Sequence, residues 1–127
     1  MFVNVSNVPF SDWQETQLND AKLYGHLYEF RMQETDPEAS TSAIVEQAKS
    51  LADRIAKIVW ENDESKNAVM VLGEPSFSFA LIRELQIRRL TVVCPTYRIE
   101  LYDDDELIET FVRFRNYAIS ETLEEDE

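Results

Sequence analysis

The side chains of this 127-residue chain that could bind or turn over a ligand are hydroxyl, amide and guanidinium groups that follow apolar runs. They are Ser6, Asn7, Ser76, Ser78, Thr96, Tyr97 and Arg98. Groups of this kind bind phosphates and sugars, especially beside the free N–H groups of a helix start. Without an imidazole, a lysine or a metal beside them, they deprotonate a nucleophile poorly. We therefore expect them to bind a ligand and to assist attack by the ligand's own 2′-hydroxyl, through orientation and charge stabilisation.

Each of these residues also has a purely structural interpretation, as a helix cap or a turn stabiliser. The two interpretations stay open above all for Ser76 and Ser78, which follow Pro75 at a predicted helix start. A single arginine such as Arg98 is more commonly a solvated or ion-paired surface residue.

Other kinds of site lack the residues that they need. Two glycines cannot build a glycine-rich phosphate loop, and one cysteine with one histidine cannot form a usual zinc site. Between Cys94 and Arg98 too few residues remain to wrap an anion, so Cys94 is expected to be a buried strand residue. His26 falls at the opposite end of the predicted sheet, and the acidic run at residues 103–106 is typical of a solvated turn. We expect neither a metal nor a cofactor.

The element that positions the candidate groups is the stretch of residues 67–85. Its apolar run through Leu72 is too continuous for a strand with one wet face, and is typical of a buried parallel strand. Gly73 permits a sharp turn, and Pro75 suits the first turn of the helix that follows. Ligands of open α/β sheets bind at the carboxyl ends of strands, so this turn is the expected location of a site.

The remaining chain supplies further strands and helices. Strands are predicted over residues 2–5, 26–32 and 90–94, and the most regular helical periodicity runs from Ile44 to Val59. Ser11 with Gln14 has the form of a capping box, and a glycine at residue 25 is expected to end that first helix. Pro95 is expected to halt the fourth strand.

The C-terminal part predicts a β-hairpin, with strands over residues 97–102 and 107–114 and an acidic tip between them. Strict alternation would place Val112 and Phe114 on one face of the return strand. The acidic tail, residues 121–127, is predicted to be disordered.

Alternating strands and helices predict a single Rossmann-like α/β domain over residues 1–120. Its mainly parallel sheet should have the core order 2-1-3-4, with helices on both faces and the hairpin beyond the fourth strand. This order creates a switch point between the first and third strands. Asn7 and Ser76 should therefore line one crevice, with Arg98 nearby.

The net charge of −13 limits the classes of partner. Residues 1–66 carry −6, residues 67–120 carry −2 and residues 121–127 carry −5. This acidity disfavours long duplex nucleic acid, which is bound by neutralising phosphates with Lys and Arg. No apolar run approaches the roughly 20 residues of a membrane helix, and one unpaired Cys with no leader before the first strand indicates a cytoplasmic protein.

Four segments carry a resemblance to a known group of proteins: FVNVSNVP, VLGEPSFSFALIREL, LTVVCPTYR and FVRFRNY. Together they resemble small, single-domain Rossmann-like accessory proteins of type III CRISPR systems, a group that includes CARF-type sensors and ring nucleases. The resemblance implies a homodimer whose paired crevices bind a cyclic oligoadenylate. It also implies metal-independent cleavage by in-line attack of a ribose 2′-hydroxyl.

The positions that match the group's motifs are Asn4, Ser6, Asn7, Trp13, Gly73, Glu74, Ser76, Ser78, Thr96, Tyr97 and Arg98. In the function so implied, Arg98 would neutralise phosphate, Ser6 and Ser76 would hold phosphate oxygens, and Asn7 would orient the ribose. Ser6, Asn7 and Arg98 would thus form the catalytic set. Val8 departs from the pattern, because the relatives carry a His at this position.

Two other functions remain open from the sequence. The chain could be a non-enzymatic acidic protein that presents its hairpin and tail to a basic protein partner, as an inhibitor does. It could also be a small-molecule hydrolase or transferase that uses Glu74 as a base, although no partner residue for Glu74 is evident.

Overall fold

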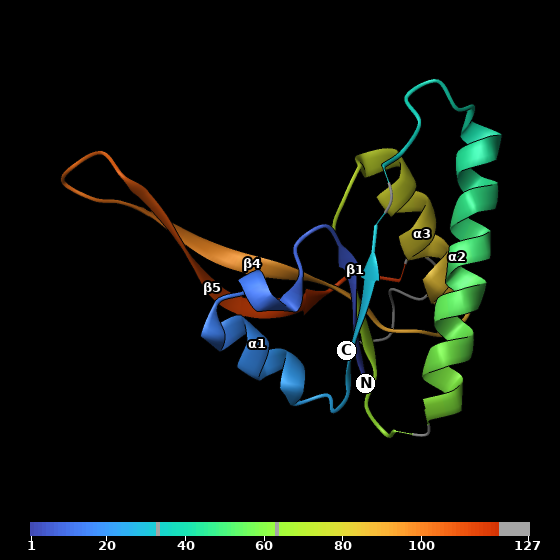
Figure 1. Cartoon of the computed structure of the whole chain (residues 1–127), viewed down its shortest axis with the longest axis horizontal. Helices are drawn as coiled ribbons and strands as arrows, with labels where there is room; N and C mark the ends of the chain where they lie inside the picture. The colour runs from blue at the N-terminus through green and yellow to red at the C-terminus, as the bar shows by residue number, and fades with distance from the viewer. Residues whose placement is uncertain (33, 63, 120–127) are drawn as a thin grey trace.

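The computed structural model describes residues 1–32, 34–62 and 64–119, so the predicted acidic tail lies outside the described residues. Figure 1 shows the arrangement of the elements. In chain order they are β1 (Phe2–Ser6), the 3-10 turn η1 (Phe10–Asp12), α1 (Glu15–Lys22), β2 (Leu27–Arg31), α2 (Thr41–Asn62), β3 (Ala68–Val71), α3 (Pro75–Ile87), β4 (Val92–Leu101) and β5 (Leu107–Asn116).

The five strands form one mixed sheet of order β2-β1-β3-β4-β5. β2, β1, β3 and β4 are parallel, and β5 pairs antiparallel with β4. The predicted α/β class, the core order 2-1-3-4 and the C-terminal hairpin are therefore confirmed. None of the described helices is both long enough and apolar enough to cross a membrane.

Helices cover both faces of the sheet, as predicted (Figure 1). The alternation of β1 explains the two layers, because Val3 and Val5 pack in the core under α2 and α3, whereas Phe2 packs on the side of α1. Asn4 and Ser6 share the α1 face with Phe2. β1 therefore carries its polar residues on one face, toward its carboxyl end.

The two glycines serve different purposes. Gly25 has a φ of 109° and ends the first helical segment, as predicted. Gly73 does not have a positive φ, so the sharp turn is not what requires a glycine there. A Cβ at position 73 would overlap Sδ of Met32, and the absence of a side chain lets the buried Met32 pack against this turn.

The predicted capping box at Ser11 is wrong. Ser11 lies in η1, and α1 begins at Glu15 with Gln14 as its N-cap. The Gln14 side chain does not cap the helix, because its amide bonds to β5 instead: Nε2 donates to the Glu109 carbonyl at 2.8 Å and Oε1 accepts from the Phe111 N–H at 2.9 Å. Gln14 thereby satisfies backbone groups on the open edge of the sheet.

The prediction that Pro95 halts the fourth strand is also wrong, because β4 runs through it to Leu101. The Val69 N–H donates to the Thr91 carbonyl, so alternate residues from Thr91 onward turn their backbone groups toward β3. Pro95 belongs to that series but lies beyond Val93, the last β4 residue that pairs with β3. The missing N–H of Pro95 therefore faces an edge that has no partner strand.

The prediction that Val112 and Phe114 share one face of the return strand is wrong, because β5 contains a β-bulge. The ladder pairs Thr96 with Arg113 but Tyr97 with Phe111, which leaves Val112 as the extra residue. Phe111 and Phe114 are consequently both buried on the α1 face, whereas Val112 is exposed.

Beyond the bulge the hairpin projects away from the sheet, and we call residues 98–110 the arm (Figure 1). Ile99, Leu101 and Leu107 continue the face that carries Phe111, but with 60 to 66% of their surface exposed. The apolar face of the hairpin thus extends past the part that α1 covers.

Candidate functional site

A hollow of about 170 Å³ lies at the carboxyl edge of the sheet, between the ends of β1 and β2. The β1 side contributes Asn4, Ser6, Asn7 and Pro9, and the β2 side contributes Glu29, Phe30 and Arg31. The strand register explains this set, because Asn4 lies beside Glu29 and Ser6 beside Arg31 in the parallel ladder. The carboxyl edge of such a sheet is where α/β proteins bind ligands.

Hydrogen bonds within the chain fix the loop that follows β1. The Ser6 hydroxyl donates to Oδ1 of Asn4 at 2.7 Å and accepts from the Val8 N–H at 3.1 Å. Nδ2 of Asn4 donates to the Val8 carbonyl at 2.9 Å. Asn4 and Ser6 are 1% and 4% exposed, so these buried polar groups satisfy one another. Their direct role is to hold the exposed Asn7 at the rim of the hollow.

Trp13 reaches the same loop from the other side. Its indole N–H donates to the Val8 carbonyl at 3.0 Å, and its ring packs against Phe2, Phe10 and Phe114. Trp13 therefore joins the aromatic core to the loop and does not line the hollow.

The turn after β3 lies beside the β1 loop, because Val5 is level with Val71 and the Leu72 N–H donates to the Val5 carbonyl. Gly73, Glu74 and Ser76 are nevertheless not among the residues that line the hollow. The sequence predicted that the turns after β1 and β3 line one crevice. The two turns are neighbours at the carboxyl edge of the sheet, but the hollow lies between β1 and β2.

Glu74 occupies the N-terminus of α3. Its Oε1 accepts from the Phe77 N–H at 2.8 Å, and the Ser76 hydroxyl donates to the same carboxylate at 2.7 Å. These two hydrogen bonds, the Phe77 bond foremost, lower the pKa of Glu74 below its ordinary value of 4.5. The Glu74 carboxylate thus occupies the place at the N-terminus of α3 where an anionic ligand would bind. The Ser76 hydroxyl is engaged in a hydrogen bond to this carboxylate.

Ser78 lies one helical turn after Glu74 in α3, and its buried hydroxyl has no hydrogen-bond partner among the described residues. It is not among the residues that line the hollow.

The three β4 residues that were predicted near the crevice, Thr96, Tyr97 and Arg98, do not face the hollow. The Thr96 hydroxyl donates to the Arg113 carbonyl at 2.8 Å, and the Tyr97 hydroxyl donates to Oε1 of Gln17 at 2.9 Å. Partial burial is the main reason why the pKa of Tyr97 is raised above its ordinary value. Arg98 is exposed on the arm opposite Thr110. The structure therefore does not bring residues 96–98 into the hollow.

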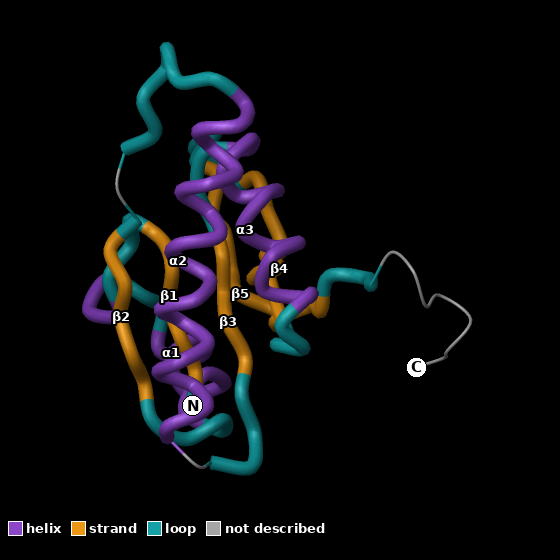
Figure 2. The backbone as a smooth tube through the Cα atoms, turned by 90° about the vertical axis from the view of Figure 1, so that its right-hand side faces the viewer, coloured by secondary structure: helices purple, strands orange, loops and turns teal. Residues whose placement is uncertain are grey.

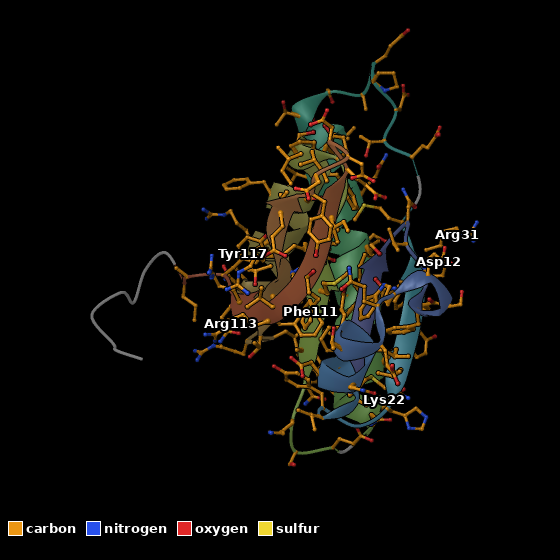
Figure 3. All side chains as sticks on the ribbon, turned by 90° about the vertical axis from the view of Figure 1, so that its left-hand side faces the viewer. Asp12, Lys22, Arg31, Phe111, Arg113 and Tyr117 are labelled. Atoms are coloured by element: carbon orange, nitrogen blue, oxygen red, sulfur yellow. The ribbon has the colours of Figure 1, made fainter. Side chains whose placement is uncertain are left out.

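Arg31 is the cationic residue that lines the hollow, and sequence reasoning missed it. Figure 3 shows Arg31 at the border of the molecule, far from Arg113. The neighbouring Glu29 carboxylate accepts a hydrogen bond from the Phe10 N–H. The signal that could have identified Arg31 is its place at the end of the second strand, which the order 2-1 sets beside the end of the first.

The arrangement can bind a compact anion with sugar hydroxyls attached, through one guanidinium, one exposed amide and the loop backbone. None of the residues that line the hollow is a His, Lys or Cys. No group of three or more His, Cys, Asp or Glu side chains within the described ranges is placed to hold a metal ion. Comparisons of the chain with protein-family models, with curated proteins and with solved structures found no significant match.

Proposed function

We propose that this protein binds a cyclic oligoadenylate, the ligand that its resemblance to type III CRISPR accessory proteins implies, and that one phosphate of the ring lies in the hollow. The observation that carries the proposal is the meeting of Asn7 and Arg31 around a cavity of about 170 Å³ at the carboxyl edge of a doubly wound sheet. We also propose the homodimer that the resemblance implies, in which two hollows bind one ring.

Arg31 supplies the positive charge in this assignment, in place of Arg98, and donates to phosphate oxygens. Asn7 orients the ribose through its amide. Ser6 and Asn4 act through the loop, because their polar groups are bonded to each other and to Val8.

Cleavage would proceed by attack of a ribose 2′-hydroxyl oxygen on the adjacent phosphorus. The P–O5′ bond breaks, which leaves a 2′,3′-cyclic phosphate, and the proton of the 2′-hydroxyl is balanced by the proton that the 5′-oxygen takes up. With Val8 in place of a histidine, the hollow offers orientation and charge stabilisation only. We therefore propose binding as the main function and cleavage as a slow accompanying activity.

Replacing Arg31 with Gln should weaken binding of cyclic tetra- or hexa-adenylate about 10- to 100-fold, since a hydrogen bond to a charged group contributes about 1.5 to 3 kcal/mol. Isothermal titration calorimetry without added metal measures the affinity, and chromatography of the same samples detects linear products. Lys22→Gln is the matched control, because it removes one positive charge at the far end of α1 (Figure 3). Absence of binding of either ring to the wild-type protein would refute the proposal, and so would equal affinity for the wild type and the Arg31 variant.

A second candidate function is the binding of a basic protein partner by the arm. The observation that favours it is the projecting hairpin, whose exposed Ile99, Leu101 and Leu107 lead to the acidic tip at residues 103–106. An apolar strip beside concentrated charge is typical of a protein-binding surface.

A variant with a neutral tip should fail to retain the partners that the wild-type protein retains from an extract of its own cells. Its substitutions are Asp103→Asn, Asp104→Asn, Asp105→Asn and Glu106→Gln. Retention by the wild type should also fall as salt is raised, because exposed charges are screened. Retention of the same proteins by the tip variant would exclude the arm as the binding surface.

A further inference from the structure

A second cavity, of about 550 Å³, lies between the edge strand β2 and helix α2. Figure 2 shows β2 at the border of the sheet, beside α2. Tyr28 and Phe30 contribute aromatic rings to this groove, and α2 contributes Gln47, Ser50 and Arg54. A volume of this size, with aromatic walls and a few polar groups, is typical of a small-molecule site.

The groove adjoins the hollow, because both are lined by Glu29, Phe30 and Arg31. Phe30 packs on the α2 side of the sheet, whereas Leu27, two residues before Glu29, packs on the α1 side. The two cavities therefore flank β2 from opposite faces. Because β2 is an edge strand, a ligand that occupies both cavities passes around its unpaired edge near Arg31.

The groove carries the features that recognise a base. The Arg54 guanidinium lies over the Phe30 ring, 5.3 Å from its centroid, and the Tyr28 ring lies 5.2 Å from that of Phe30. Nucleic-acid bases stack on aromatic rings and on guanidinium planes of this kind. The Gln47 amide and the Ser50 hydroxyl can donate to and accept from the edge of a base.

The charge of the groove also favours a nucleotide. Arg54 is the charged side chain that faces the groove from α2, because the alternation of β2 directs Glu29 and Arg31 to the α1 face. The groove is thus net positive in a chain of net charge −13. The Glu29 carboxylate is engaged with the Phe10 N–H. An anionic ligand is therefore better accommodated here than over most of the surface.

We propose that this groove binds the base and ribose of the nucleotide unit whose phosphate lies in the hollow. The assignment rests on the proposed function, because it takes the hollow as a phosphate site. The class of ligand is a nucleotide, which the proposed function makes an adenylate, with Arg54 stacked on the base and Arg31 between base and phosphate.

The test compares adenosine 5′-monophosphate, inorganic phosphate and cyclic tetra-adenylate as probes, with the wild type, Arg54→Gln and Lys57→Gln. Lys57 lies one turn further along α2, is exposed and does not line the groove, so its variant controls for the loss of one charge. Both substitutions lie on the exposed side of a long helix, and the melting temperature checks that each variant folds.

We expect adenosine 5′-monophosphate to bind the wild type more tightly than inorganic phosphate does, and Arg54→Gln to weaken the nucleotide about 10-fold while leaving phosphate unchanged. Lys57→Gln should change neither affinity. Equal affinities of the wild type for nucleotide and phosphate would overturn the inference, as would a nucleotide affinity that Arg54→Gln leaves intact.

The two proposals fail in different ways. If cyclic tetra-adenylate binds and Arg54→Gln has no effect on it, the groove assignment is wrong and the proposed function stands. If the mononucleotide binds with the Arg54 dependence but the cyclic ligand does not bind, the groove assignment stands and the cyclic ligand is wrong.

Discussion

Replacing Asn4 with Asp should lower the free energy of unfolding by about 3 to 5 kcal/mol at neutral pH, the usual cost of an uncompensated buried charge. Asn4 is 1% exposed, and its Nδ2 donates to the Val8 carbonyl. In the variant a carboxylate oxygen would face that carbonyl oxygen, and no donor would join them. Urea unfolding at pH 7 measures the change.

The pH dependence of the Asn4→Asp variant separates this cause from a general packing defect. Burial and the facing carbonyl raise the pKa of the new carboxyl in the folded protein above its unfolded value of about 3.9. The folded state therefore prefers the protonated form, and the stability gap between variant and wild type should narrow as the pH falls toward 4. Ser6→Ala, which introduces no charge, should cost about 1 kcal/mol and show no such narrowing. If the difference in unfolding free energy between variant and wild type did not change with pH, the buried hydrogen bond from Asn4 to the Val8 carbonyl would not be what holds the loop.

Replacing Phe2 with Ala should cost about 3 to 5 kcal/mol of unfolding free energy, as for other large-to-small core substitutions. The Phe2 ring is fully buried and lies 4.8 Å from Phe114, 5.5 Å from Tyr24 and 5.9 Å from Trp13, measured between ring centroids. It is the point at which β1, α1 and β5 meet. Chemical denaturation with fluorescence detection of the tryptophans reports the loss.

Phe79→Ala is the matched control for this substitution, because Phe79 is 65% exposed on α3. Its loss should change stability by no more than about 0.5 kcal/mol. The Trp13 ring packs against Phe2, and its indole N–H donates to the Val8 carbonyl in the loop after β1. Phe2→Ala should therefore also weaken ligand binding at the hollow. Similar stability for the two variants would show that the layer under α1 contributes little to the fold.

The sequence predicted the fold because its periodicities are strong. The helix α2 buries Ile44, Ala48 and Ile55, the apolar series that repeats at three and four residues. The order 2-1-3-4 follows from alternating strands and helices with right-handed connections. What the pattern could not supply were long-range contacts: Gln14 bonds to β5, far along the chain, and the bulge at Val112 reverses the faces of the return strand.

The site was harder to predict than the fold, because residue type does not reveal where a hydrogen bond is already made. Ser6 and Asn7 were correctly placed at the carboxyl edge, but the Ser6 hydroxyl is engaged with Asn4, and Ser76 with Glu74. The prediction that Arg98 lies near the crevice depends on Pro95 ending the fourth strand at the carboxyl edge of the sheet. The strand continues instead, and it carries Arg98 onto the arm.

The most direct measurement is a titration of ¹⁵N-labelled protein with cyclic tetra-adenylate, followed by two-dimensional NMR. Binding at the hollow predicts that the backbone resonances of Asn7, Val8 and Arg31 and the side-chain amide of Asn7 shift with a common dissociation constant, while those of Ile99 and Leu107 stay in place. Shifts confined to the arm, or a spectrum that the ligand leaves unchanged, would contradict the assignment of this edge as the ligand site.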